Sequence, residues 1–238
     1  MAAPPFFQSG RATAAAPPLF RSGPTIEPGA RTAADLHFYE PGKGHGLRHN
    51  PFKAIVAPRP IGWISTRSAG GVNNLAPYSF FNAFCEAPPI VGFACASDNR
   101  DTLHNVEQTG EFVFNLVTRA LAERMNATSA SVAPDVDEFT LAGLTPAPSR
   151  LIAAPRVAQS PVSFECRRTD VLQLRAADGS PAPAWLVLGE VIGVHLDKAL
   201  LRDGTYDTAA AQHLARAGGL GDYFWVCADT MMQMKRPG

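Results

Sequence analysis

The sequence predicts a mainly β protein, an antiparallel β-barrel with helical insertions. From about residue 36, short apolar runs are separated by Pro and Gly, a pattern typical of β-barrels and β-sandwiches. Only a few helical patches occur, and they do not alternate regularly with the strands, which disfavours a doubly wound parallel sheet. A length of 238 residues with 46% apolar and 18% charged residues provides for a sizeable core.

The first expected strands form a hairpin. Residues 54–57 and 61–66 are strand-like, and the small residues Ala69, Gly70 and Gly71 turn the chain into a partner strand over 72–78. The segment that follows, 79–82, leaves the hairpin after the bend expected at Pro77. We therefore expect the backbone amides of 79–82 to point outward.

The later strands are longer or more apolar. Residues 90–96 form a continuous small-apolar run, as in a strand buried on both faces. The alternation over 111–117 places Phe112, Phe114 and Leu116 on one side. Residues 162–174 and 185–196 are long enough to be bent barrel strands, and the second has plausible bulge points at Gly189 and Gly193.

Helices are expected over 101–110, 119–128 and 208–217. The first has the clearest signature, because Asp101 or Thr102 can cap it and Gly110 can end it. We place the globular domain over 36–238 and interpret residues 1–35, rich in Ala, Pro, Gly and Ser, as a flexible arm. An arm that packs on a partner subunit, a targeting segment and an upstream start are the alternatives.

Composition disfavours several classes of protein. Lys and Arg number 21, as do Asp and Glu, so no overall charge attracts nucleic acid or an anionic membrane. No apolar run reaches the roughly 20 residues of a membrane span, and the N-terminus lacks a secretory signal, so we expect a cytoplasmic protein. The cysteines form no CxxC pair and His45 and His49 lie in a Gly- and Pro-rich stretch, so no metal site is expected.

The segment 79–82 has a mixture of groups that suits a planar cofactor bearing a phosphate. Ser79 and Asn82 supply short polar side chains, while Phe80 and Phe81 supply flat apolar surface. A core strand has little use for that mixture. The segment is interpreted as one half of a flavin site.

Residues 97–105, SDNRDTLHN, follow the apolar strand and open the first helix. Free N–H groups and the helix dipole favour an anion there, and the guanidinium of Arg100 adds charge-assisted hydrogen bonds. Ser97, Arg100 and Thr102 stand at the entrance of this helix and are the candidate anion-binding residues. Simple capping by Asp101 or Thr102, with Arg100 paired to a neighbouring carboxylate, is the alternative.

Several motifs together resemble one family. PRPIGWIST, NLAPYSFFN, the APP before the apolar strand, RDTLHN and TGEFVFNLV occur in the order and spacing of the flavin reductase-like, or flavoredoxin, family. The resemblance covers about residues 45–236 and implies an FMN-binding split β-barrel of antiparallel Greek-key type. It also implies a homodimer with FMN near the subunit interface. The cofactor-binding residues that it implies are Arg59, Trp63, Ser65, Ser79, Phe80, Phe81, Asn82, Arg100, Asp101 and Thr102.

Other residues have two interpretations. Arg216 and Tyr223, in RAGGLGDY, resemble a late family element bordering the nicotinamide or substrate side, or belong to a Gly-rich turn after a helix. His195 is either an interior or interface histidine or a polar contact to flavin or nicotinamide. Cys85 is a departure from the family pattern, either a small buried hydrophobe or a redox thiol beside the flavin.

The resemblance implies an oxidoreductase in which NADH or NADPH transfers a hydride to N5 of FMN. The flavin carries the chemistry, so no protein acid or base is required and no catalytic side chain is assigned. The electrons would pass to free flavin, a partner monooxygenase or redox protein, oxygen or another acceptor. The alternatives are an electron carrier without nicotinamide turnover and a non-catalytic module that binds flavin or haem.

Overall fold

The computed structural model describes residues 29–96, 100–219 and 221–237. The chain divides into two units, Met1–Arg48 and His49–Gly238. The described part of the first unit contains two short 3₁₀ helices, η1 (Ala33–Asp35) and η2 (Pro41–Lys43). Most of the predicted arm over 1–35 lies outside the described residues, so its nature stays a prediction.

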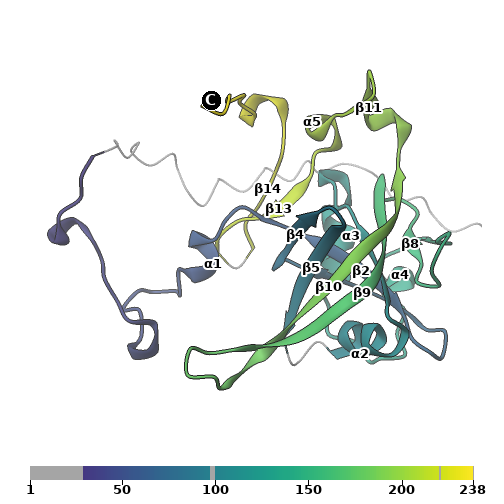
Figure 1. Cartoon of the computed structure of the whole chain (residues 1–238), viewed down its shortest axis with the longest axis horizontal. Coiled ribbons are helices and arrows are strands. Elements are labelled where there is room, and N and C mark those ends of the chain that lie inside the picture. Colours follow the sequence, from purple (N-terminus) through teal and green to yellow (C-terminus); the bar gives the residue numbers. More distant parts are fainter. Residues whose placement is uncertain (1–28, 97–99, 220, 238) are drawn as a thin grey trace, which may run out of the picture. The chain divides into compact units, whose positions relative to one another are not determined.

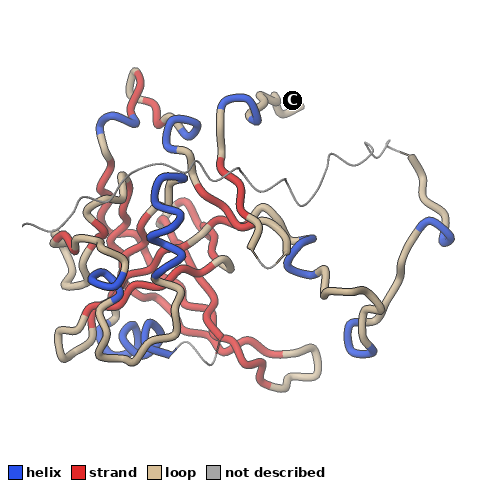
Figure 2. The backbone as a smooth tube through the Cα atoms, turned by 180° about the vertical axis from the view of Figure 1, so that it is seen from behind, coloured by secondary structure: helices blue, strands red, loops and turns tan. Residues whose placement is uncertain are grey.

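A seven-stranded antiparallel sheet dominates the second unit, which confirms the mainly β fold. Its strand order is β3-β2-β6-β9-β10-β5-β4, so strands far apart in sequence pair with each other. Figure 1 shows β9 and β10 running side by side as the longest strands, and Figure 2 shows the strands gathered between peripheral helices. The strands are β2 (Gly62–Arg67), β3 (Asn73–Tyr78), β4 (Phe81–Glu86), β5 (Pro89–Ala96), β6 (Glu111–Asn115), β9 (Val162–Arg175) and β10 (Pro181–Leu196).

A second, three-stranded sheet has the order β1-β13-β14. It consists of β1 (Arg59–Pro60), β13 (Leu214–Arg216) and β14 (Tyr223–Trp225), with Arg59 opposite Arg216 and Arg216 opposite Tyr223. β13 and β14 lie close to α1 (Phe52–Ile55) (Figure 1). Two further two-stranded sheets pair β7 (Pro146–Ala147) with β8 (Arg156–Val157) and β11 (Leu201–Arg202) with β12 (Thr205–Tyr206).

The helices are short. The longest is α2 (Arg100–Thr109), which packs on β2 and β3 and forms where the sequence predicted it. The others are η3 (Arg119–Leu121), α3 (Ala122–Ala127), α4 (Glu138–Leu141), η4 (Lys198–Leu200), α5 (Thr208–Ala211) and η5 (Ala228–Thr230). Within the described ranges, no helix is long and apolar enough to cross a membrane.

Two apolar clusters form the core of the described barrel. The first contains Phe112, Phe114 and Leu116, so the alternation predicted for this strand is confirmed. The second surrounds Trp63, with Leu75 and Phe139 among its members, and underlies α3 and α4. Burial of Val, Leu and Phe side chains of this kind contributes about 1.5–3 kcal/mol each, so these clusters hold the sheet together.

The two glycines predicted as bulge points in β10 lie at irregularities of its pairing with β9. The register shifts between Leu188 and Gly189 and again between Val191 and Gly193. At Gly189 a Cβ atom would overlap the ring of the buried Phe112. The bulges bend the strand, and the missing side chain lets Phe112 approach its backbone.

Two of the expected elements differ. Residues 54–57 were predicted as a strand, but residues 54 and 55 end α1, at whose start Asn50 Oδ1 accepts a hydrogen bond from the Phe52 N–H (2.9 Å). The helix predicted over 208–217 ends at Ala211, because Gln212 adopts a left-handed conformation (φ 47°) and the chain continues into β13. The bend expected at Pro77 is also displaced, because Pro77 lies within β3 opposite Trp63 and the chain bends at residues 79 and 80, before β4 begins at Phe81.

Candidate functional site

Arg59 holds three segments together at the start of the barrel. Its Nη1 donates to the carbonyls of Lys53 and Val56 (2.6 Å for Val56), and its Nη2 donates to the carbonyl of Ala217 (3.4 Å). Only 5% of the residue is exposed. Burial and, after it, the nearby guanidinium of Arg216 lower the pKa of Arg59 from its usual value. A buried charge beside a second like charge favours an anionic neighbour.

The side chain of Arg59 also faces the segment 79–82. Its Nε lies 3.5 Å from Ser79 Oγ, and its guanidinium lies 5.9 Å from the centroid of the Phe80 ring. Phe80 is 43% exposed, whereas Phe81 packs inward and stacks on Phe114 with a centroid distance of 4.7 Å. The two phenylalanine rings therefore lie on different sides of the chain. Phe80 is the one with an exposed ring face beside a cation.

The phosphate half of the predicted site adjoins this cluster through β5. The Ala94 N–H donates to the carbonyl of Phe80 (2.8 Å), which fixes segment 79–82 to the end of β5. That end leads, through residues 97–99, into α2. Residues 97–99 and the side chain of Arg100 lie outside the described residues. The aromatic segment and the N-terminus of α2 are thus brought to the same end of one strand.

Thr102 is fully buried in the first turn of α2. Asn74 Nδ2 donates to Thr102 Oγ1 (2.8 Å), which ties the helix to β3. The hydroxyl of Tyr78 is buried nearby without a hydrogen-bond partner among the described residues, although Thr102 is close enough to affect its pKa. Burial raises the pKa of Tyr78, so its hydroxyl stays protonated and retains an unused donor. Asp101, in the same turn, is partly exposed.

Arg216 and Tyr223 lie on the same small sheet as Arg59. The Arg216 guanidinium stacks 4.5 Å from the centroid of the Tyr223 ring, and Arg216 pairs with Arg59 in the strand register. Side chains alternate between the two faces of a strand, so Tyr223 and Trp225 share one face of β14. The structure thus brings Arg59, Phe80, Arg216 and Tyr223 together around one edge of the barrel.

Trp63 and Ser65 are placed elsewhere. Both are fully buried in β2. Trp63 Nε1 donates to Thr128 Oγ1 (2.9 Å), and Ser65 Oγ donates to the carbonyl of Pro155 (2.5 Å). Their hydrogen-bonding groups are used inside the barrel, and neither residue lines any of the three cavities described below.

His195 is paired with a buried carboxylate. Its Nε2 lies 2.5 Å from Glu165 Oε1, and Glu165 also accepts hydrogen bonds from the backbone N–H groups of Arg150 (2.8 Å) and Leu151 (2.7 Å). Burial acts to raise the pKa of Glu165, but these hydrogen bonds outweigh it and hold the pKa below its usual range. His195 lines none of the three cavities, so its partner in the described structure is Glu165.

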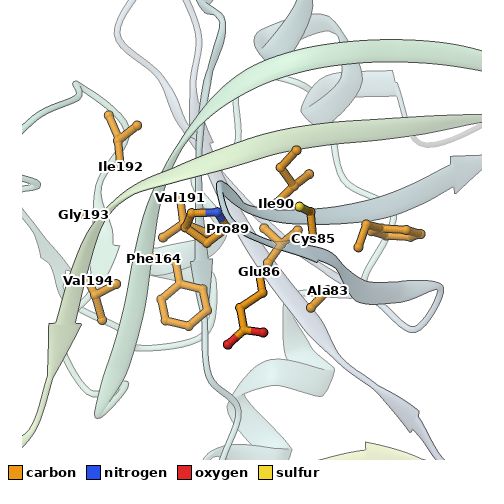
Figure 3. A pocket seen from close by; sticks show the side chains of 12 residues that line it. Ala83, Cys85, Glu86, Pro89, Ile90, Phe164, Val191, Ile192, Gly193 and Val194 are labelled. Carbon is orange, nitrogen blue, oxygen red and sulfur yellow. The ribbon is translucent and has the colours of Figure 1, made fainter.

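Two cavities lie beside β4. One, of about 550 Å³, is mainly apolar and contains Phe81, Asn82 and a hydrogen-bonded pair, Tyr206 Oη and His213 Nε2 (2.8 Å). Burial lowers the pKa of His213 and raises that of Tyr206, so both are neutral near pH 7. The other cavity, of about 660 Å³, is shallow and is shown in Figure 3, where Cys85, Glu86 and Phe164 line it.

A third cavity, of about 520 Å³, extends the surface of Arg216 and Tyr223. Arg119, Glu123 and Trp225 also line it, and the Arg119 guanidinium stacks 4.0 Å from the centroid of the Trp225 ring. Sequence reasoning missed Arg119 and Trp225. Trp225 could have been found, because aromatic residues stand at alternate positions of 223–225. Nothing in the sequence near Arg119 indicates a role for Arg119, because a long-range bridge between Thr118 and His213 positions this residue.

Comparison with known proteins identifies the family. A family model described as a flavin reductase like domain matches residues 56–214. The chain belongs to the flavin reductase-like family. A protein of Halalkalibacterium halodurans is 34% identical over 168 residues, which cover 69% of this chain and 80% of the relative. One from Deinococcus radiodurans is also 34% identical, over 79% of this chain and 84% of the relative.

Solved structures with this fold include a flavin reductase with a split barrel domain from Shewanella frigidimarina, which is 26% identical with a TM-score of 0.68 over 78% of this chain and 90% of that chain. Component B of nitrilotriacetate monooxygenase from Bacillus cereus is 26% identical, with a TM-score of 0.70 over 91% of this chain and all of that chain. The 2-nitrobenzoate 2-nitroreductase of Pseudomonas fluorescens is also 26% identical, with a TM-score of 0.72 over 85% and 96%. A flavoredoxin from Desulfovibrio vulgaris shares the fold at 21% identity and a TM-score of 0.65, over 76% and 91%. The predicted split β-barrel and the family resemblance are confirmed.

Proposed function

We propose that this flavoprotein binds FMN and uses NADH or NADPH to reduce it. The observation that carries the proposal is the hydrogen bond from Ala94 to Phe80, which joins the exposed aromatic ring beside Arg59 to the strand that leads into α2. A flat ring system with a phosphate tail needs both kinds of surface within reach of one ligand. FMN, when bound, supplies hydride acceptance at N5 of its ring.

The residues present fit that cofactor. The exposed face of Phe80 and the backbone of 79–82 suit the ring, and Arg59 contributes a buried positive charge beside it. The first-turn N–H groups of α2 lack intrahelical partners and favour a phosphate. Asn74 holds this turn in place through Thr102, and the unused hydroxyl of Tyr78 adds a donor from β3. Two of the predicted cofactor-binding residues, Trp63 and Ser65, would act indirectly, by holding β2 in position.

The nicotinamide would approach from the side of Arg216 and Tyr223. Arg216 lies next to Arg59 in the small sheet and Tyr223 lies next to Arg216, and both are accessible from solvent. The role of the protein is to bind, orient and exclude water, since hydride transfer to a flavin needs no protein acid or base. His195, held by Glu165, has no part in this proposal.

Anaerobic reduction tests the function. We expect the purified, FMN-loaded protein to lose its oxidised flavin absorbance when NADH or NADPH is added without oxygen. Free FMN at the same concentration is the control for the non-enzymatic rate. If neither nucleotide reduces the bound flavin faster than free FMN, the reductase proposal is wrong and the electron-carrier alternative takes its place.

The acceptor of the electrons is proposed by analogy. The Bacillus cereus neighbour is a component B of a monooxygenase, and by analogy we propose a partner oxygenase that takes up reduced flavin as the acceptor for this chain. The Pseudomonas fluorescens neighbour is a nitroreductase, which favours direct reduction of a small nitroaromatic molecule as a second candidate. Product analysis with a nitroarene present separates the two, because only the second consumes it.

We also propose a homodimer formed through β4 and β10. Every residue of β4 after Phe81 is exposed, and the shallow cavity of Figure 3 is bordered by the exposed apolar side chains of Phe84 (56%) and Val194 (60%). β4 is also an unpaired edge of the sheet, and proteins usually cover such an edge.

Sedimentation velocity tests the dimer. We expect about twice the chain mass of 25.3 kDa at micromolar concentration, and dissociation of the Phe84→Glu variant to monomers, because a charge would be buried in the interface. Leu172→Glu, which alters an exposed leucine of β9 outside the cavity, is the matched control. A wild-type protein that sediments as a monomer would contradict the proposal.

A further inference from the structure

The described structure contains three arginine guanidinium groups that lie over aromatic rings, and all three lie at or beside the small sheet β1-β13-β14. They are Arg59 on Phe80, Arg216 on Tyr223 and Arg119 on Trp225. Such contacts occur roughly once per 70–80 residues, so their number is ordinary for this chain. Their arrangement is informative, because the small sheet joins them into a row.

Strand register gives the order of the row. Arg59 pairs with Arg216, and Arg216 pairs with Tyr223. Trp225 lies two residues further along β14, a rise of roughly 7 Å, on the same face as Tyr223. Arg119 covers Trp225 from the adjoining helix η3. The row therefore begins beside Phe80 and ends at Arg119, in the cavity of about 520 Å³.

Arg119 has hydrogen-bonding capacity to spare. Its backbone N–H donates to the carbonyl of Gln212 (3.0 Å), which fixes the start of η3. Its guanidinium forms no ion pair or hydrogen bond with the described residues and is exposed, although stacking on Trp225 restricts its orientation. A guanidinium that lies over a ring face without a hydrogen-bond partner has N–H groups available to bind a phosphate in a bidentate manner.

We infer that Arg119 binds the phosphate on the adenosine ribose of NADPH, so that this protein prefers NADPH to NADH. The inference rests on the proposed function, because it takes the nicotinamide end to lie at the flavin near Phe80. A dinucleotide bound from there passes Arg216 before its adenosine end reaches the cavity of Arg119 and Trp225. NADH lacks the extra phosphate and leaves Arg119 without an anion.

Binding of nucleotide fragments tests the inference without turnover. Adenosine 2′,5′-bisphosphate and adenosine 5′-monophosphate differ in the phosphate in question, and calorimetry on the FMN-loaded protein gives a Kd for each. We expect Arg119→Gln to weaken the bisphosphate about tenfold or more, as for a lost charge-assisted hydrogen bond, and the monophosphate less than threefold. Arg119→Lys keeps the charge but loses the planar guanidinium that can bind a phosphate in a bidentate manner, so we expect an intermediate loss of affinity for the bisphosphate.

Arg124→Gln is the matched control, because Arg124 is an exposed arginine on the adjoining helix α3 and does not line the cavity. It should leave both Kd values unchanged. Equal losses for the two fragments in Arg119→Gln, or no loss, would overturn the inference.

Kinetics separates this inference from the proposed function. The ratio of kcat/KM for NADPH to that for NADH should fall about tenfold in Arg119→Gln and stay constant in Arg124→Gln. Flavin reduction with an unchanged ratio would overturn the inference and leave the reductase function intact. The opposite result is also informative. If Arg119 is needed to bind the bisphosphate but neither nucleotide reduces the flavin, the phosphate site is supported and the reductase function is wrong.

Discussion

Replacing Trp63 with alanine should lower the free energy of unfolding by about 3–5 kcal/mol, the range for removing a large aromatic side chain from a core. Trp63 is fully buried, and its Nε1 donates to Thr128 Oγ1, which in turn donates to the carbonyl of Met125 (2.7 Å). The substitution removes the centre of the cluster between β2 and α3 and leaves this hydrogen-bond chain without its donor. Chemical denaturation followed by circular dichroism gives the loss.

Trp63→Phe separates packing from cofactor contact. It keeps an aromatic ring but loses the N–H, so we expect a smaller loss of stability, about 1–2 kcal/mol. Measured well below the unfolding temperature, the Kd for FMN should match that of the wild type. A stable Trp63→Phe protein with strongly weakened FMN binding would instead show that Trp63 contacts the flavin, as the family resemblance implied.

Local patterns were sufficient for most of the large sheet. Period-two alternation in 111–117 and the small-residue turn before 72–78 both depend on neighbouring residues, and both predictions match β6 and β3. The strand expected at 54–57 was wrong because the same apolar residues also fit one helical turn. Pro51 stands at the N-cap, and Asn50 before it accepts a hydrogen bond from the first helical N–H, that of Phe52, so both favour the start of a helix.

The small sheet could not be predicted in this way. β13 is only three residues long and exists because it pairs with β1, which lies far away in the sequence. The sequence pattern of 208–217 favours a helix throughout, but tertiary pairing ends it after Ala211. Arg216 and Tyr223 were recognised by resemblance, whereas Arg119 and Trp225 required the structure. The hairpin of β13 and β14 aligns Trp225, but Arg119 is brought to it by the long-range bridge between Thr118 and His213.

The same limit applies to segment 79–82. Its composition indicated a planar ligand, but not that Phe80 and Phe81 face opposite sides of the chain. The inward position of Phe81 follows from Gly62, since a Cβ atom there would overlap the Phe81 ring. The predicted site therefore separates into an outer part, with Arg59 and Phe80, and a cavity-facing part, with Phe81 and Asn82.

Replacing Arg59 with methionine should produce the largest loss of FMN binding of any single substitution described. Arg59 supplies the buried positive charge beside Phe80, and a charge-assisted hydrogen bond contributes about 1.5–3 kcal/mol, which corresponds to a Kd increase of roughly 10- to 150-fold. Its loss also leaves the carbonyls of Val56 and Ala217 without their donor, so α1 and the loop after β13 should loosen. Titration of the apoprotein with FMN, followed by flavin fluorescence, measures the Kd.

Two further variants decide whether Arg59 acts on the cofactor or only on the fold. Arg67→Met is the matched control, because Arg67 is an exposed arginine on β2 that donates to one carbonyl, that of Gly71 (3.1 Å), and should leave FMN binding unchanged. Arg59→Lys keeps the charge, but a single ammonium group cannot reach the carbonyls of both α1 and the loop after β13, so it should lose stability while recovering part of the FMN affinity. If Arg59→Met is destabilised yet binds FMN with the wild-type Kd, Arg59 is a structural residue and the anion at this edge of the barrel must be held by α2 alone.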